Sequence, residues 1–421
     1  MRPQVSRRDL LKMTAAGLVG VSSAGWIEQL ARAAADAPAT GSRKSCILLW
    51  MNGGPSQCHT FDVKPNGEFG TIPTTVDGIR ISEHLPQLAG QMRHLALLRS
   101  MSTSEVVHER ARFLMHTSYR QSGASVYPSL GCIASHELGQ PDFELPNFVA
   151  IDGGIDGNNA GGAYRSTPSF LGPRHAPLVV ADPDRGVENL RPAIELNALD
   201  ARASFLDRQE SRFQERLGAA NIAAHRTTYQ RAMQLLHSSR SRAFDLDREP
   251  EQVRQLYGNS QFGKGCLLAR RLVETGVPFV EVTYGGWDDH GGAAAPIRRR
   301  SPIMDRAMAG LIQDLSQRGL LDNTLVVWMG EFGRSPGNGN GHYARCWTTV
   351  LAGGGIRAGQ VVGRSSDRGD TPAERPISPT DYMATLCRIL GIDPDKQFTT
   401  RESRPVRLVD RGGSVVEQLF Q

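Results

Sequence analysis

The chain alternates short, continuous apolar runs with longer stretches in which apolar residues recur every three or four positions. The apolar runs are bounded by Gly, Pro or polar residues, which is typical of buried strands. They lie at residues 46–51, 95–98, 148–151, 277–282, 324–329 and 348–352. Helical periodicity lies at residues 85–92, 109–119, 193–246, 252–274, 304–318 and 379–390. This alternation predicts an α/β fold in which helices cover both faces of a mostly parallel sheet.

The N-terminus has the pattern of an export signal. Ser6-Arg7-Arg8 opens the run SRRDLLK, a weakly apolar stretch follows, and three alanines precede Asp36. We therefore expect residues 1–35 to be a twin-arginine signal peptide and the mature protein to be periplasmic or extracellular. The apolar stretch is too short to span a membrane, and no later segment approaches the length of a membrane helix, so no transmembrane anchor is expected in the mature chain.

Residues 36–421 are expected to form a single α/β domain with a helical excursion near residues 193–248. This excursion is long, polar and rich in Arg and Gln, which fits a solvated helical insertion or a lid over a site. The 48 basic residues exceed the 43 acidic ones by only five, and they are interleaved with acids along the chain. A nucleic-acid partner is not expected, because such partners require basic residues gathered on one face.

Polar residues that could bind a cation follow the predicted strands. The run YGGWDDHGG follows the strand that ends at residue 282, GEFGRSP follows residue 329, and His342 precedes the strand that opens near residue 347. Ligands gather at the carboxyl ends of parallel strands, so Asp288, His290, Glu331 and His342 are expected to converge. Carboxylates with neutral imidazoles suit a divalent ion, whereas one exposed Asp-His pair alone is an ordinary surface feature.

Glu331 and His342 are expected to lie close together. The reason is that both would flank adjacent parallel strands at the same edge of the sheet. Side chains that share one ion, with typical bonds of about 2.0–2.6 Å, must have their tips within about 8 Å of each other.

A second cluster lies at the start of the helix predicted after residue 98. His108 and Arg112 are four residues apart, so they share one helix face. Helix N-termini attract anions, and the arginine fork matches phosphate or sulfate oxygens. The segment predicts either an oxyanion site or a charged, solvated helix start.

The chain resembles the exported family catalogued as domain of unknown function 1501, within the alkaline phosphatase and sulfatase superfamily. The resemblance covers nearly the whole mature chain, and it implies an alkaline-phosphatase-like three-layer α/β/α sandwich. It rests on the runs GGPSQCHTFDVKP, SEHLPQLA, HERARFLMHTSY, EPEQVRQLYGNSQFGKGCLLARRLVETGVPFVEV, GGWDDHGG, GEFGRSP and LAGGGIRAGQVVG.

Three positions depart from the sulfatase pattern. Asn52 and Gly53 stand where sulfatases place paired aspartates, Phe332 stands where they place a histidine, and His108 falls near the nucleophile position. The resemblance thus adds Asn52 to the expected metal ligands. Loss of a carboxylate and an imidazole reduces the metal charge that the site can neutralise, so one divalent ion is expected rather than two. Zinc, calcium and manganese all fit such ligands.

The resemblance implies a metal-dependent hydrolase acting on small-molecule or glycan phosphate or sulfate esters. Asp288, His290, Glu331 and His342 would hold the ion, and Arg112 and Arg334 would clamp the oxyanion. His108 would be the nucleophile or the general acid and base, although it could also be a metal ligand or a structural histidine. The alternative is a non-catalytic envelope or glycan-binding protein with a degenerate metal site.

Overall fold

A computed structural model of the protein describes residues 43–122, 127–140, 142–155, 166–190, 192–217, 220–400 and 403–420. The predicted signal peptide, residues 1–35, lies outside the described residues. From Arg43 onward the chain forms one compact unit. In the described part of the chain, no helix combines the length and the apolarity needed to cross a bilayer.

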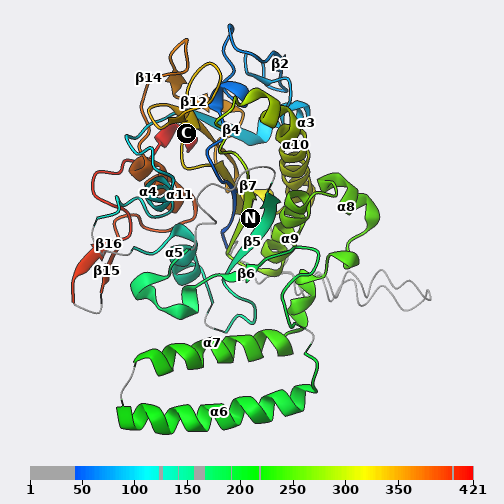
Figure 1. Ribbon diagram of the computed structural model, residues 1–421, viewed down its shortest axis with the longest axis vertical. Helices are drawn as coiled ribbons and strands as arrows, with labels where there is room; N and C mark the ends of the chain where they lie inside the picture. Colours follow the sequence, from blue (N-terminus) through cyan, green and yellow to red (C-terminus); the bar gives the residue numbers. More distant parts are fainter. Residues whose placement is uncertain are drawn as a thin grey trace, which may run out of the picture. The chain divides into compact units, whose positions relative to one another are not determined.

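An eight-stranded sheet with the order β12-β4-β11-β8-β1-β7-β5-β6 forms the centre of this unit (Figure 1). All neighbouring strands are parallel except β11, which runs antiparallel to both β4 and β8. The prediction of an α/β fold with a mostly parallel sheet is therefore confirmed. The strands are β1 (Ser45–Met51), β4 (Leu95–Met101), β5 (Phe148–Ile155), β6 (Leu178–Val180), β7 (Phe279–Gly285), β8 (Thr324–Met329), β11 (Trp347–Gly353) and β12 (Gln360–Val362).

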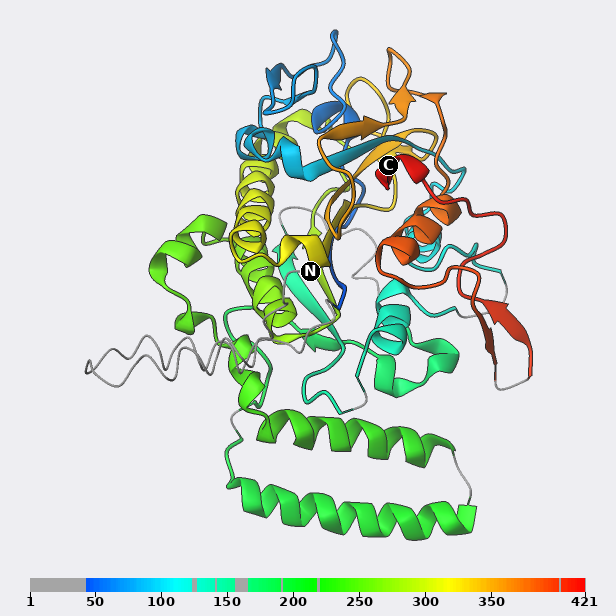
Figure 2. The same cartoon turned by 180° about the vertical axis from the view of Figure 1, so that it is seen from behind.

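Helices cover both faces of the sheet, so the architecture has three layers, as Figures 1 and 2 show from opposite sides. One face carries α3 (Pro86–Gly90), α8 (Glu251–Tyr257), α9 (Gln261–Thr275) and α10 (Ala294–Gln317). The other face carries α4 (His108–Thr117), α5 (Leu130–Glu137) and α11 (Pro379–Ile389). The sequence pattern missed α5, which is only eight residues long.

The alternation of side chains along β1 explains why both faces are covered. Ile47, Leu49 and Met51 belong to the core on the side of α9 and α10, whereas Leu48 and Trp50 belong to the core on the side of α11. Successive strand residues point to opposite faces. A strand that is apolar at every position must therefore be buried on both sides.

The predicted helical excursion consists of two helices, α6 (Leu196–Leu217) and α7 (Ala220–His237), that lie side by side (Figures 1 and 2). Two 3-10 helices, Ser239–Phe244 and Leu246–Arg248, lead from α7 back to α8. The smaller strands form two-stranded ribbons that lie outside the main sheet. They are β2 (Thr71–Pro73), β3 (Arg80–Ser82), β9 (Gly333–Arg334), β10 (His342–Tyr343), β13 (Arg364–Ser365), β14 (Pro372–Glu374), β15 (Gln397–Thr399) and β16 (Pro405–Arg407).

Candidate metal centre

Three neighbouring strands end at one edge of the sheet and deliver polar residues there. β1 lies between β8 and β7, and all three are parallel. Asn52 follows β1, Glu331 follows β8, and the loop after β7 carries Asp288. The apolar strands thus bring together residues that are distant in sequence, because their carboxyl ends share one edge.

His342 reaches the same edge by a route that differs from the expected one. It lies on β10, which pairs with β9, and the chain then enters β11. The expectation that β8 and β11 are parallel is wrong, because β11 runs antiparallel to β8. The start of an antiparallel strand meets the carboxyl ends of its neighbours, so the reversed direction places His342 beside the other site residues.

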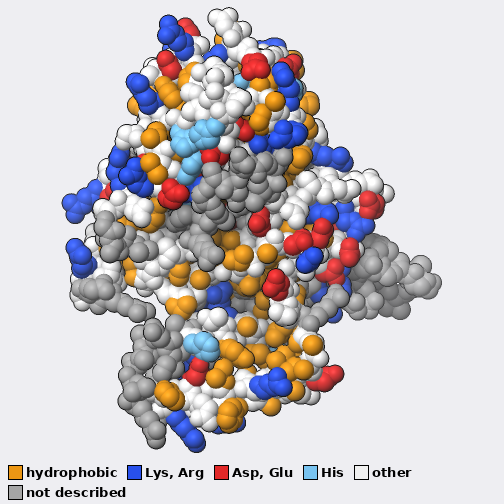
Figure 3. Space-filling model, viewed as in Figure 1, with side chains coloured by type: hydrophobic (Ala, Val, Ile, Leu, Met, Phe, Trp, Pro, Cys, Tyr) orange, Lys and Arg blue, Asp and Glu red, His pale blue; other side chains and the backbone are white. Residues whose placement is uncertain are grey.

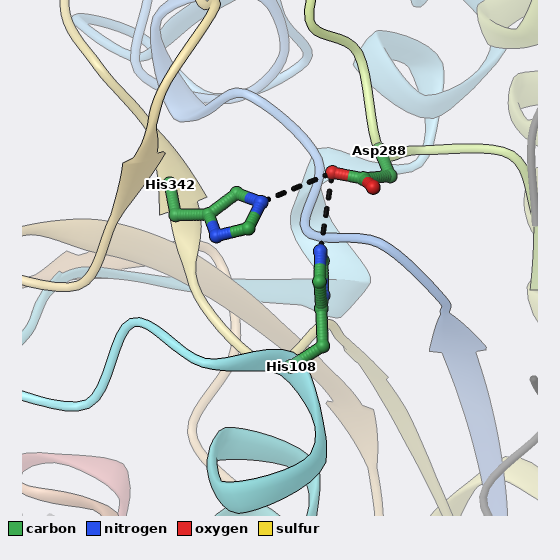
Figure 4. A group of neighbouring side chains, drawn as sticks. All are labelled: His108, Asp288 and His342. Carbon is green, nitrogen blue, oxygen red and sulfur yellow. Dashed lines mark hydrogen bonds and ion pairs between the residues drawn. The ribbon is translucent and has the colours of Figure 1, made fainter. Parts of the chain in front are cut away.

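Three imidazole nitrogens converge on one carboxylate oxygen, Oδ1 of Asp288. The Nε2 atoms of His108 and His342 lie 3.1 and 3.2 Å from it. Figure 4 shows both rings pointing toward this oxygen. Nε2 of His290 lies 3.0 Å from the same oxygen. One ligand atom from each of His108, Asp288 and His342 can be chosen so that all three lie within 4.8 Å of one another, which is close enough to share one ion.

The second ring nitrogens of His108, which is buried, and of His342, which is half-buried, each have an acceptor. Nδ1 of His108 lies 2.6 Å from Oε1 of Glu331 and donates to that carboxylate. Nδ1 of His342 donates to the backbone oxygen of Val106 at 2.8 Å. These two hydrogen bonds fix the rings so that each Nε2 faces Asp288. Nε2 of His108 is buried and has no well-aligned hydrogen bond.

The carboxylates and cations of the site are almost fully buried and compensate one another. Burial alone would lower the pKa of His108, but its interactions with Asp288 and Glu331 outweigh burial and raise that pKa to about 9. Burial alone would raise the pKa of Asp288 and of Glu331. Their interactions with His108 instead hold both pKa values below the ordinary ones, assisted by Arg334 at Asp288 and by Arg112 at Glu331.

The two arginines that were expected to bind an oxyanion are turned into the protein. Arg334 is fully buried, and its Nη2 lies 2.5 Å from Oδ1 of Asp288. Its other donors bind the backbone oxygens of Gly53, Gly54 and Asp289. Nε of Arg112 lies 3.5 Å from Oε1 of Glu331. Both guanidinium groups thus contact the carboxylates of the site.

The remaining predicted ligands occupy different positions. His290 has a side chain that is 59% exposed, so it stands at the solvent side of Asp288. Glu331 is fully buried, and its oxygens accept from the Gly53 N–H at 3.0 and 3.1 Å. The side-chain oxygen of Asn52 accepts from the indole N–H of Trp50 at 3.4 Å. Figure 3 shows histidine side chains gathered at the surface on one face of the molecule.

Close backbone approach at the end of β1 requires glycine. Gly53 has a φ of +117°, and a Cβ there would lie 2.4 Å from the backbone nitrogen of Asp288. A Cβ on Gly54 would lie 2.7 Å from the ring of Phe332. A pair of glycines one residue after an apolar strand is a sequence signal for such an approach.

The ring of Phe332 packs against the imidazoles of His108 and His342, a contact that the sequence did not reveal. Its buried ring stacks on His342 with centroids 4.8 Å apart, and it lies 5.0 Å from the ring of His108. The two imidazoles also contact each other edge to face at 4.3 Å. The ring of Phe332 therefore supports the two histidines of the site.

The family model described as "Protein of unknown function (DUF1501)" matches residues 43–420. No curated protein matches the sequence.

Solved structures with a similar arrangement of elements share little sequence with the chain. One is a sulfatase from Pseudoalteromonas sp., with 13% identity and a TM-score of 0.43, covering 87% of this chain and 70% of that one. Another is the phosphonate monoester hydrolase of Agrobacterium radiobacter, with 12% identity, a TM-score of 0.37, and coverage of 90% and 77%. The alkaline phosphatase from the Antarctic bacterium TAB5 has 10% identity, a TM-score of 0.38, and coverage of 83% and 98%. Similarity at this level carries no argument about function.

Proposed function

The chain belongs to the DUF1501 family, and we propose that it is an exported, metal-dependent hydrolase of phosphate or sulfate esters. The observation that supports this proposal is the convergence of three imidazole Nε2 atoms on Oδ1 of Asp288, each within 3.2 Å. Imidazole nitrogens and a carboxylate gathered around one point are ligands that suit a borderline divalent ion.

The hydrogen bonds around the site fit a metal centre. A histidine that binds a metal through Nε2 donates its Nδ1–H to a carboxylate or a backbone carbonyl. His108 donates to Glu331, and His342 donates to the oxygen of Val106. The buried Nε2 of His108, which lacks a well-aligned hydrogen bond, is a free ligand position once that ring is neutral.

The proposed ligands are His108, Asp288 and His342, with Glu331 as the residue that orients His108. This assignment keeps two of the ligands expected from the sequence and gives His108 the ligand role that was one of its alternatives. Two nitrogens and one oxygen favour zinc or manganese over calcium, which prefers oxygen ligands. When bound, a divalent ion supplies Lewis-acid polarisation of an ester oxygen.

Residues of the chain supply the remaining functions. His290 stands at the solvent side of Asp288, where its Nε2 can donate a proton to a leaving alkoxide. Arg334 neutralises Asp288 and binds three backbone oxygens, so it positions the loops after β1 and β7. Phe332 excludes water from the inner side of the imidazoles of the two proposed histidine ligands.

The test begins with metal content. Wild-type protein purified without chelator is expected to contain a divalent ion, measured by inductively coupled plasma mass spectrometry. Asp288→Asn and His342→Ala are expected to lose it. His136→Ala is the matched control, because His136 also contacts a carboxylate, Glu137 at 2.8 Å, and is not part of the site.

Turnover of aryl phosphate and aryl sulfate esters then tests the reaction. Activity should follow metal content in these variants, and His290→Ala should lose turnover while it keeps the ion. A wild-type protein with no affinity for divalent ions refutes the proposal.

A second function, a non-catalytic binding protein, is favoured by one observation. Arg112 and Arg334, the cations expected to bind the substrate oxyanion, both contact buried carboxylates instead. A protein that binds the ion but turns over neither ester class, and that binds sulfated or phosphorylated glycans, would support this alternative.

A further inference from the structure

The charges of helix α6 are segregated between its two faces. Three of its acidic residues, Asp200, Asp207 and Glu210, contact histidine or arginine side chains of α7. Oδ1 of Asp200 lies 2.8 Å from Nε2 of His237, Oδ1 of Asp207 lies 2.6 Å from Nε of Arg226, and Glu210 contacts His225. The acids of α6 are thus used to hold the two helices together.

The opposite side of α6, which we call the outer face, is basic and aromatic. Successive residues of an α-helix are rotated by about 100°, and this rotation places five residues on the outer face. They are Arg202, Phe205, Arg208, Arg212 and Phe213. The exposed fractions of Phe205 and Phe213 are 58% and 57%, which is high for phenylalanine, and all three arginines are exposed. The Arg208 guanidinium lies 6.0 Å from the centroid of the Phe205 ring.

Within the described residues, no ion pair is formed by the three arginines of the outer face, and no acidic residue between positions 196 and 213 falls on it. Figure 3 shows hydrophobic and basic side chains together on the surface of the hairpin. Among the described residues, three arginines without an ion pair thus lie beside two exposed rings. This combination suits a partner that is both anionic and apolar, and a surface of anionic phospholipids is both.

We propose that the outer face of α6 binds the surface of an anionic phospholipid membrane, with the helix lying parallel to the bilayer plane. The arginines would contact lipid phosphates, and the two phenylalanine rings would enter the boundary between headgroups and acyl chains. An acidic polysaccharide fits less well, because a single helix presents a convex surface and a polymer chain is normally bound in a groove lined by several elements.

This inference does not depend on the function proposed for the metal centre. The ion pairs and exposed side chains that support it all belong to the hairpin of α6 and α7. An active or inactive metal centre is compatible with membrane binding. The two proposals can therefore fail separately.

The experiment is co-sedimentation of the mature protein with two kinds of vesicle, phosphatidylcholine mixed with phosphatidylglycerol and phosphatidylcholine alone. We expect binding to the mixed vesicles, much weaker binding to the neutral ones, and loss of binding as salt rises. Each arginine near an anionic surface contributes about 5-fold to partitioning. The triple variant Arg202→Gln, Arg208→Gln, Arg212→Gln is therefore expected to bind about 100-fold more weakly at low salt.

A matched control removes the same charge elsewhere. The triple variant Arg185→Gln, Arg248→Gln, Arg364→Gln changes arginines whose side chains are 85%, 52% and 59% exposed, and it should keep most of the binding. The double variant Phe205→Ala, Phe213→Ala should also weaken vesicle binding. Glutamine and alanine are good helix formers, so circular dichroism should show α6 intact.

Three results would overturn the proposal. One is equal binding of the wild type to neutral and anionic vesicles, or no binding to either. Another is a control triple variant that loses as much binding as the outer-face variant. The third is binding to dextran sulfate without binding to vesicles, which would assign the outer face to an acidic polymer.

Discussion

Glu331→Gln tests how strongly the buried carboxylate holds His108 in its charged form. Glutamine has nearly the same shape as glutamate but lacks its charge. Glu331 is fully buried and accepts from the Gly53 N–H, from His108 Nδ1 at 2.6 Å and from Arg112 Nε at 3.5 Å. The variant thus removes the charge that these donors surround, without opening a cavity.

The magnitude follows from the pKa of His108. A rise from 6.5 to about 9 corresponds to about 3 kcal/mol of preferential stabilisation of the charged imidazole, shared between Glu331 and Asp288. For a histidine whose pKa is raised on folding, this contribution is fully present below pH 6.5 and is lost as pH rises through about 9. Glu331→Gln should therefore destabilise the metal-free protein most in mildly acidic solution.

The assay is urea unfolding of chelator-treated wild type and Glu331→Gln at about pH 6 and about pH 10. We expect the difference in free energy of unfolding between the wild type and Glu331→Gln to be about 1–3 kcal/mol larger at about pH 6 than at about pH 10. A pH-independent cost remains, because the amide of glutamine cannot accept from every donor around it. NMR titration should show that the pKa of His108 falls towards its ordinary value.

Glu374→Gln is the control. Glu374 pairs with Arg364 at 3.0 Å, but its side chain is 61% exposed, so the cost should be within about 0.5 kcal/mol at both pH values. A destabilisation by Glu331→Gln that is equal at both pH values, or greater at the higher one, would refute the reasoning about His108.

Three further predictions concern the backbone, the metal and export. Gly53→Ala should lower the free energy of unfolding in urea by about 2–4 kcal/mol and reduce metal binding, because the new Cβ would lie 2.4 Å from the backbone nitrogen of Asp288. Gly78→Ala is the control, because no atom lies within 4 Å of its Cβ, and it should cost only backbone strain. Binding of a divalent ion should release a proton from His108, so the affinity measured by calorimetry should fall about tenfold per pH unit below about pH 9. An affinity that does not change with pH would argue against His108 as a ligand. Lysines in place of Arg7 and Arg8 should leave the precursor in the cytoplasm in a fractionation assay, and unchanged export would exclude the twin-arginine route.

Local sequence pattern determined six of the eight strands of the main sheet and most helices, and it missed β6 and β12. The runs that became β1 and β8 are apolar at nearly every position, which only burial on both faces can satisfy. The polar residues that follow β7 and β8 predicted a site at the carboxyl edge of the sheet. These features are encoded within a few adjacent residues, so they can be read without knowledge of distant contacts.

Tertiary structure decided the direction of β11 and the contacts within the site. An antiparallel β11 brings His342 to Asp288 from 54 positions away, and no local pattern records strand direction. Whether Glu331 is a ligand or a hydrogen-bond partner of His108 depends on sub-ångström placement of side chains from different strands. The sequence by itself therefore determined which residue types gather at this edge, whereas strand direction and side-chain packing decided which atoms face one another.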